Sequence, residues 1–261
     1  MHFSSFKKME FFRDKYIPLL PKKDGINVLE VGSCSFHEQD SYRSIFSDLR
    51  FLYTGLDLSS GPNVDLVPKR PFYWQEIEDD SFDVCVCGQV FEHNPFFWVT
   101  FCEMVRVTKP GGFLCVIAPG AGEVHLYPYD CWRFYPDSWR ALCTLSGVEM
   151  LESWMESDEF ADCVPGGVWR DSAVIARKPS EDSAEINQKL RTIIGPFAHL
   201  EVDLIPKSPI GPAQRAYEEW MEIHHPPTLI TKLRRKSPRL RRVLIVLPRA
   251  AGMQQEHKKK N

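Results

Sequence analysis

The chain has 261 residues, of which 43% are hydrophobic and 26% charged, so it can bury a full core and is not disordered as a whole. No stretch approaches the roughly 20 apolar residues of a membrane span, and the first residues lack the apolar core of a secretion signal, so we expect a cytoplasmic protein. Eight cysteines without any C-x-x-C pair indicate reduced packing residues rather than disulfides or zinc ligands, and we expect no metal site.

The first two predicted strands end in residues suited to a nucleotide-type ligand. Residues 26–31 form an apolar run that stops at Gly32, and the next apolar run, 51–58, ends around Asp57. A glycine turn lets the backbone approach a ligand closely, and a carboxylate after the neighbouring strand accepts hydrogen bonds from ribose hydroxyls. The spacing from Gly32 to Asp57 suits one strand, one helix and one strand.

The loop after the first strand favours S-adenosylmethionine over NAD. It reads Gly-Ser-Cys-Ser-Phe over residues 32–36, with one glycine where a dinucleotide loop has G-x-G-x-x-G. A pyrophosphate needs bare backbone amides, whereas a ligand without a central phosphate tolerates side chains there.

The following segments predict an alternation of strands and helices. Apolar runs predict strands, and 3.6-residue periodicity or Pro and Gly at the ends predict helices. The expected strands are 81–88, 113–118, 148–154 and 168–176, and the expected helices are 95–107 and 136–146.

Four of these segments, in this order and spacing, resemble the class I S-adenosylmethionine-dependent methyltransferases. They are 28–32, 53–58, 81–88 with the Glu-His pair at 92–93, and 106–112, and the resemblance covers about residues 10–178. It implies an α/β, Rossmann-like fold with a seven-stranded sheet, helices on both faces and a C-terminal antiparallel hairpin. The chain departs from the family in lacking the later loop glycines, which affects the path around the methionine moiety.

The charge distribution divides the chain. Residues 232–261 hold eleven Lys and Arg against one acid, a balance of +10, so residues 1–231 carry 21 minus 34, or −13. We expect a methyltransferase domain over 1–178, with a capping helix within 1–24, and a proline-rich, basic, helical or irregular extension over 179–261. Its expected helices are 183–194 and 213–223.

Two interpretations of the basic tail stay open. With the apolar strip 243–247 it suits an acidic partner, nucleic acid or the surface of a membrane, which would make the protein peripheral to that membrane. A solvated basic face packed on the domain fits equally well.

The resemblance and the strand ends together predict the cofactor site. Glu30, Gly32 and Ser33 would shape the loop around the methionine portion, and Asp57, followed by Leu58, would bind the ribose. Two further residues complete the set. Trp74 would stack on adenine, with core packing as an equal alternative, and Gln89 would contact the amino-acid end.

The segment 125–137 gathers polar and aromatic side chains between a strand and a helix, where a core linker needs none of the charges. We expect His125 to be the general base, because an imidazole titrates near neutrality, with Asp130 orienting it and Arg133 clamping an anion. An Asp130–Arg133 structural clip is the alternative. His93 is expected at the catalytic site as a positioning element. The predicted substrate-binding residues are Tyr127, Trp132 and Arg133.

The predicted function is O-methylation of a sugar or small metabolite, by in-line transfer from S-adenosylmethionine assisted by a general base. One alternative is a cofactor-binding scaffold without turnover. Another is a nucleic-acid or protein methyltransferase guided by the basic tail. The acidic first 231 residues argue against nucleic acid, because a face that binds phosphates should itself be positive.

Overall fold

The computed structural model describes residues 3–21, 25–35, 41–161, 163, 165, 167–201 and 212–225. It consists of two units, residues 1–205 and 206–261. In the second unit, helix α6 (Pro212–His224) confirms the helix expected at 213–223. The basic segment 232–261, with its apolar strip, lies outside the described residues, as does Phe36. Within the described part of the chain, no helix has both the length and the apolar character needed to cross a bilayer.

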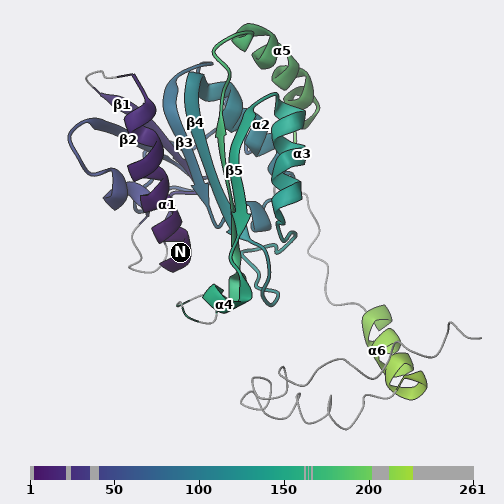
Figure 1. The fold of residues 1–261 in the computed structure, drawn as a ribbon. Helices are drawn as coiled ribbons and strands as arrows, with labels where there is room; N and C mark the ends of the chain where they lie inside the picture. Colours follow the sequence, from purple (N-terminus) through teal and green to yellow (C-terminus); the bar gives the residue numbers. More distant parts are fainter. Residues whose placement is uncertain are drawn as a thin grey trace, which may run out of the picture. The chain divides into compact units, whose positions relative to one another are not determined.

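The first unit is built on a mixed sheet with strand order β2-β1-β3-β4-β6-β5 (Figure 1). The four strands β1 to β4 run parallel, and β6 is antiparallel to both β4 and β5. Residues 156–170 connect β5 to β6. The strands are β1 (Ile26–Val31), β2 (Phe51–Leu56), β3 (Phe82–Gly88), β4 (Thr108–Pro119), β5 (Glu149–Met155) and β6 (Asp171–Arg177).

The expectation of seven strands is wrong for the described residues, which form six. Residues 57–81 connect β2 to β3 mainly through turns, and their one contribution to the sheet is a bridge between Leu56 and Leu66. Pro62, Pro68 and Pro71 interrupt this segment, and a proline cannot donate a hydrogen bond to a neighbouring strand. The segment therefore passes the sheet edge without becoming a strand.

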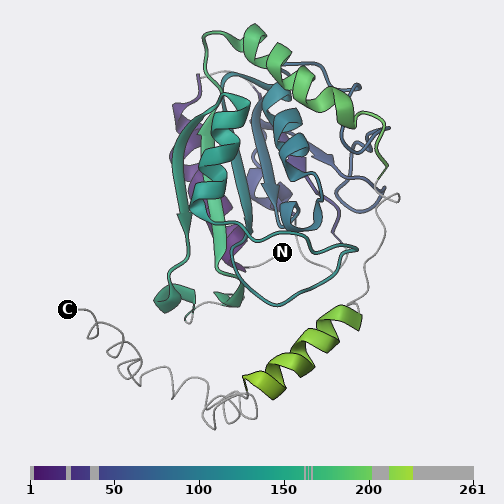
Figure 2. The same cartoon turned by 90° about the vertical axis from the view of Figure 1, so that its right-hand side faces the viewer.

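Helices cover both faces of the sheet (Figures 1 and 2). On one face lie α1 (Phe3–Tyr16) and the short 3-10 helix η2 (Tyr42–Phe46). Helix α1 packs through Met9, Phe12 and Tyr16. On the other face lie α2 (Phe97–Val107) and α3 (Pro136–Ser146), and α5 (Ser183–Ile194) packs against both of these helices. Because the central strands are buried on both faces, their sequences are continuous apolar runs.

The helix ends follow the residues that the sequence singled out. Helix α3 begins with Pro136 in its first turn and ends at Gly147, whose φ of 76° is the left-handed conformation of a helix C-terminus. Between β1 and β2, the described residues contain only η2 where a helix was expected. The remaining short elements are η1 (Ile17–Leu19), η3 (Phe91–His93), α4 (Asp158–Ala161), η4 (Gly167–Trp169) and η5 (Gly195–Phe197).

Helix α5 belongs to the first unit, although it lies beyond residue 178. Its residues Asn187, Leu190 and Ile194 are buried. The amine of Lys178, just after β6, donates hydrogen bonds to Asn187 at 2.8 Å and to Asp80 at 2.6 Å. This polar cluster fastens α5 to the end of the sheet.

Candidate active site

A pocket of about 540 Å³ lies at the carboxyl ends of the parallel strands, where ligands of open α/β sheets bind. Its walls come from the segments after β1, β2 and β3 and from the loop after β4. All seven predicted cofactor residues line this pocket: Glu30, Gly32, Ser33, Asp57, Leu58, Trp74 and Gln89. Of the other predicted residues, His93, His125 and Tyr127 line it as well, whereas Asp130, Trp132 and Arg133 do not. None of the lining residues comes from α1, so this helix supports the sheet rather than covering the pocket.

Gly32 makes the sharp turn that opens the pocket. Its φ is 82°, and a Cβ atom there would lie 2.1 Å from Cγ2 of Val90, so both conformation and space require glycine. Ser33 follows, almost fully buried, and its hydroxyl has no hydrogen-bond partner. The turn therefore presents an unsatisfied polar group beside the pocket.

Asp57 follows β2 at the neighbouring strand end. Its carboxylate accepts hydrogen bonds from the backbone N–H of Cys34 at 3.0 Å and of Ser59 at 3.3 Å. These bonds join the two loops and fix the carboxylate at the pocket wall. Each oxygen can accept a further bond.

Glu30 is a buried carboxylate near the end of β1. It accepts hydrogen bonds from the Tyr53 hydroxyl and from the backbone N–H of Tyr42. Burial raises its pKa to about 7, although these two bonds act in the opposite direction. Its position supports the end of β1.

Trp74 and Gln89 differ in how they meet the pocket. Trp74 is 1% exposed within the core, and its indole N–H donates to the Pro71 carbonyl at 3.2 Å. Gln89 has a φ of 60°, and its Nε2 donates to Asp171 at 3.1 Å, while its Oε1 is buried without a partner. Trp74 is thus packed in the core while it lines the pocket, so its stacking on adenine stays a prediction, and Gln89 offers a free acceptor.

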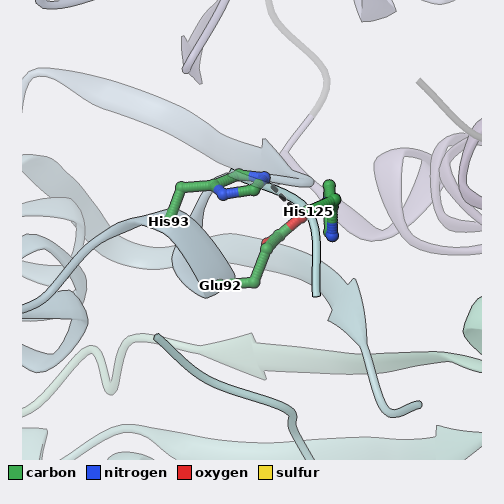
Figure 3. Close-up of side chains that lie close together, drawn as sticks. All are labelled: Glu92, His93 and His125. Atoms are coloured by element: carbon green, nitrogen blue, oxygen red, sulfur yellow. Dashed lines mark ion pairs between the residues drawn. The ribbon is translucent and has the colours of Figure 1, made fainter. Parts of the chain in front are cut away.

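Glu92, His93 and His125, which follow β3 and β4, line the same pocket, and Figure 3 shows their side chains close together. Glu92 and His93 lie in η3, just after β3, and His125 lies in the loop after β4. Since β3 and β4 are neighbouring parallel strands, their carboxyl ends bring these side chains together. The two imidazole rings meet edge to face, with centroids 4.7 Å apart.

The electrostatics of this cluster are dominated by burial. Glu92 is fully buried, which raises its pKa to about 8, and neither of its oxygens accepts a hydrogen bond from another residue. Burial also lowers the pKa of His93, with His125 adding to the effect and a hydrogen bond to the Tyr129 carbonyl opposing it.

Asp130 and Arg133 form a bidentate ion pair, with distances of 2.5 and 2.8 Å. Asp130 also accepts the backbone N–H of His125 at 2.7 Å, and Arg133 donates to the Glu123 carbonyl at 2.9 Å. Burial alone would raise the pKa of Asp130, but the bonds from Arg133 and His125 outweigh it and hold the pKa below its usual value. The geometry is that of the structural clip, which shapes the loop carrying His125.

The aromatic residues of the same loop lie in two places. Tyr127 lines the pocket and is 61% exposed. Trp132 lies outside it, and its indole N–H donates to the Asn94 carbonyl at 3.1 Å. Trp132 therefore fastens the loop to the segment after η3.

Glu92 is the residue of this cluster that the predicted site omitted. The sequence contained a signal, because Glu92-His93 follows a buried strand directly. The sequence could not show how deeply the Glu92 carboxylate is buried or that it lies near His125, because both depend on the fold of residues 120–135.

Comparison with known proteins gives consistent matches. Residues 31–116 match the family model described as a methyltransferase domain. An uncharacterized methyltransferase of Mycobacterium leprae is 33% identical over 99 residues, covering 33% of this chain and 35% of the relative. One of Mycobacterium tuberculosis is 53% identical over 36 residues, 14% of each chain. The matches thus span about a third of these relatives' length or less.

Solved structures with low sequence identity share the fold, among them a methyltransferase with its ligands bound. The 1,6-didemethyltoxoflavin-N1-methyltransferase of Burkholderia thailandensis, with 1,6-didemethyltoxoflavin and S-adenosylhomocysteine bound, matches with a TM-score of 0.51 at 13% identity. The match covers 67% of this chain and 79% of that protein. At this identity, the likeness concerns the fold alone.

Proposed function

We propose that this chain, which carries a class I S-adenosylmethionine-dependent methyltransferase domain, transfers a methyl group from S-adenosylmethionine to an oxygen atom of a sugar or small metabolite. The observation that carries the proposal is a single pocket with two chemically different ends. One end holds Gly32, Asp57 and Gln89, which suit a nucleoside with an amino-acid tail. The other holds Glu92, His93 and His125, which suit a polar acceptor.

The residues at the first end fit the cofactor. Gly32 allows close approach of the backbone, and Asp57 has lone pairs left for the ribose hydroxyls. The hydroxyl of Ser33 and Oε1 of Gln89 are buried and unpaired, so a ligand with hydrogen-bond donors, such as the ammonium group of the methionine portion, would satisfy them.

The cofactor, when bound, supplies a methyl group made electrophilic by the sulfonium charge. The protein must align the acceptor, exclude water and assist removal of the hydroxyl proton. Since His93 and His125 touch and Glu92 lies beside them, we assign the last task to these three side chains as a unit, in place of His125 alone. The Asp130–Arg133 clip holds His125 in position.

The acceptor end favours a small uncharged or cationic molecule. Residues 1–231 carry a formal charge of −13, which opposes a phosphate-rich acceptor. The imidazoles and the ring of Tyr127 offer polar and aromatic contacts of the kind that bind hydroxylated rings.

Calorimetry with S-adenosylmethionine and S-adenosylhomocysteine tests the cofactor half of the proposal. We expect micromolar binding, about −8 kcal/mol, and a loss of about 1–3 kcal/mol in Asp57→Ala. The control is Asp137→Ala, an exposed carboxylate at the start of α3, which should bind as the wild type does. Unchanged affinity in Asp57→Ala would remove this carboxylate from the site.

A screen of hydroxylated sugars and small metabolites, followed by release of S-adenosylhomocysteine, tests the transfer half. With an accepted substrate, His125→Ala should keep cofactor affinity and slow transfer by about a hundredfold. Methylation found only at nitrogen or carbon would contradict O-transfer, and normal turnover in His125→Ala would contradict the role of the cluster.

A further inference from the structure

The cluster of Glu92, His93 and His125 is arranged like a set of metal ligands. One potential ligand atom from each residue lies within 4.8 Å of the other two. Figure 3 shows the Glu92 carboxylate directed at the ring of His93, with His125 beside them. Glu92 and His93 lie in η3, after β3, and His125 lies in the loop after the neighbouring strand β4, where its backbone N–H donates to Asp130 at 2.7 Å.

Glu92 supplies an observation independent of this proximity. Its side chain is buried, and both carboxylate oxygens are without a hydrogen-bond partner. Burying a carboxylate without compensation costs several kcal/mol or more, so such groups are normally paired or coordinate a metal. The closest basic atom is Nε2 of His93, 3.6 Å from Oε1 of Glu92.

The hydrogen bond of His93 fixes the tautomer of its ring, and therefore which ring nitrogen keeps a free lone pair. Its Nδ1 lies 2.6 Å from the Tyr129 carbonyl, and a carbonyl only accepts, so Nδ1 carries the proton. In the neutral ring, Nε2 then carries the lone pair. A histidine held by a backbone carbonyl through its other nitrogen is the usual arrangement of a metal-ligating imidazole.

The separation of the two acceptors suits a shared ion. Two ligands at about 2.1 Å from a tetrahedral zinc ion lie about 3.4 Å apart, close to the 3.6 Å between Glu92 and His93. The carboxylate oxygen of Glu92 and the unprotonated Nε2 of His93 are both acceptors, so they cannot hydrogen-bond to each other unless a proton lies between them.

His125 completes the set. Its Nδ1 is buried without a hydrogen-bond partner. The nearest acid, Asp130, lies 3.4 Å from this nitrogen, but its oxygens already accept bonds from Arg133 and from the backbone of His125. The clip thus positions the ring and leaves its nitrogen available.

We propose that Glu92, His93 and His125 bind a divalent transition-metal ion at the acceptor end of the pocket. Two imidazoles and one carboxylate favour zinc, cobalt, nickel or iron over magnesium, which prefers oxygen ligands. Three protein ligands leave a coordination position for the oxygen of an acceptor, so with the ion bound these side chains would serve as ligands, and the ion would acidify the acceptor hydroxyl in place of a free base. That last role rests on the proposed function, whereas binding of the ion does not. The expectation of no metal site considered only the cysteines, and these three residues are a different ligand set.

The test is metal binding by the 261-residue protein, freed of metal by dialysis against a chelator. Zn²⁺ affinity is measured by competition with a chromophoric chelator, and Co²⁺ coordination by its visible absorption. We expect one tight equivalent of Zn²⁺, weaker binding of Mg²⁺, and a Co²⁺ spectrum of nitrogen and oxygen ligation. Glu92→Gln and His93→Gln should each weaken Zn²⁺ binding at least about tenfold.

His199→Gln is the matched control, since this histidine is exposed and contacts Arg70, outside the pocket lining. It should bind Zn²⁺ as the wild type does. If Glu92→Gln fails to fold, His125→Gln, in the loop, replaces it and should show the same loss. Thermal melts confirm that each variant is folded.

Three results would overturn the inference: no Zn²⁺ binding by the wild type, unchanged affinity in Glu92→Gln and His125→Gln, or a Co²⁺ spectrum of thiolate ligation. The two proposals fail separately. Zn²⁺ binding lost in the cluster variants, without any methyl transfer, would support the metal site and count against the function. Methyl transfer by a protein that binds no Zn²⁺ would support the proposed function and count against the metal site.

Discussion

At the scale of single residues, Glu30 shows how a buried acid affects stability as well as the pocket. It lies at the end of β1 and is 1% exposed. Burial raises its pKa from 4.5 to about 7, so the folded protein binds a proton more tightly than the unfolded chain does between these pH values. The contribution of Glu30 is fully present below pH 4.5 and is lost as the pH rises through about 7.

We therefore predict that Glu30→Gln reduces the pH dependence of stability. The free energy of unfolding, measured in urea at pH 5 and pH 8, should fall less steeply in the variant, by an amount on the order of 3 kcal/mol. Glu149→Gln changes an exposed acid and should leave the wild-type slope unchanged. Equal slopes for Glu30→Gln and the wild type would mean that Glu30 is ionised in the folded state.

At the same scale, the sequence predicted which residues end the first two strands beside the pocket, because glycine and a carboxylate at strand ends have direct geometric meanings, whereas their binding of a cofactor stays a prediction. Gly32 and Asp57 occupy the expected positions at the pocket. The sequence predicted less about the loop after β4. The bidentate pairing of Asp130 with Arg133, and the depth of Glu92, depend on a loop conformation that no local pattern determines.

At the scale of elements, the connection between the sheet and α5 depends on Lys178. Its amine is fully buried and bonds to Asp80, Asn187 and the carbonyls of Arg106 and Thr108. Burial lowers the pKa of this amine, and Asp80 opposes that effect. One side chain thus links β6, the turn before β3, and α5.

Replacing this amine should loosen α5. We predict that Lys178→Met lowers the free energy of unfolding by about 2–4 kcal/mol, because several buried acceptors lose their donor. Lys189→Met, on the exposed side of α5, should change it by less than about 0.5 kcal/mol. Denaturant unfolding of both variants makes the comparison, and similar values would rule out a structural role for the Lys178 cluster.

Most elements could be predicted from the sequence because their apolar runs and terminal prolines and glycines act locally. β1 to β4, α3 and α5 fall within a few residues of the expected ranges, apart from the longer N-terminal part of β4. The seventh strand, which only the resemblance implied, is absent from the described residues. The prolines in 57–81 oppose a strand there, and the described residues between β1 and β2 form only η2.

At the scale of the whole molecule, the pocket depends on the loop between β4 and α3, which contributes His125 and Tyr127 to its lining. The loop after β4 is fastened through Arg133 to Asp130, through Trp132 to Asn94, and through the backbone of Cys131 to Glu92. These contacts hold the loop whose His125 and Tyr127 line the pocket.

We predict that Arg133→Met frees this loop without affecting cofactor binding. Asp130, 1% exposed, would lose its cation. Hydrogen exchange over residues 124–129 should accelerate at least about tenfold, while affinity for S-adenosylhomocysteine stays within about twofold. Arg140→Met, at an exposed arginine, serves as the comparison. Unaltered exchange in Arg133→Met would show that the remaining contacts suffice.

The hydrogen bonds of Asp171 have a consequence for the far side of the sheet. Ser4, in α1, donates to one of its oxygens at 2.5 Å, and Gln89 donates to the other at 3.1 Å. A hydroxyl on the outer layer thereby shares an acceptor with a pocket amide 85 positions later in the sequence. A substitution at Ser4 can accordingly shift the Gln89 amide through Asp171, although Ser4 itself does not line the pocket.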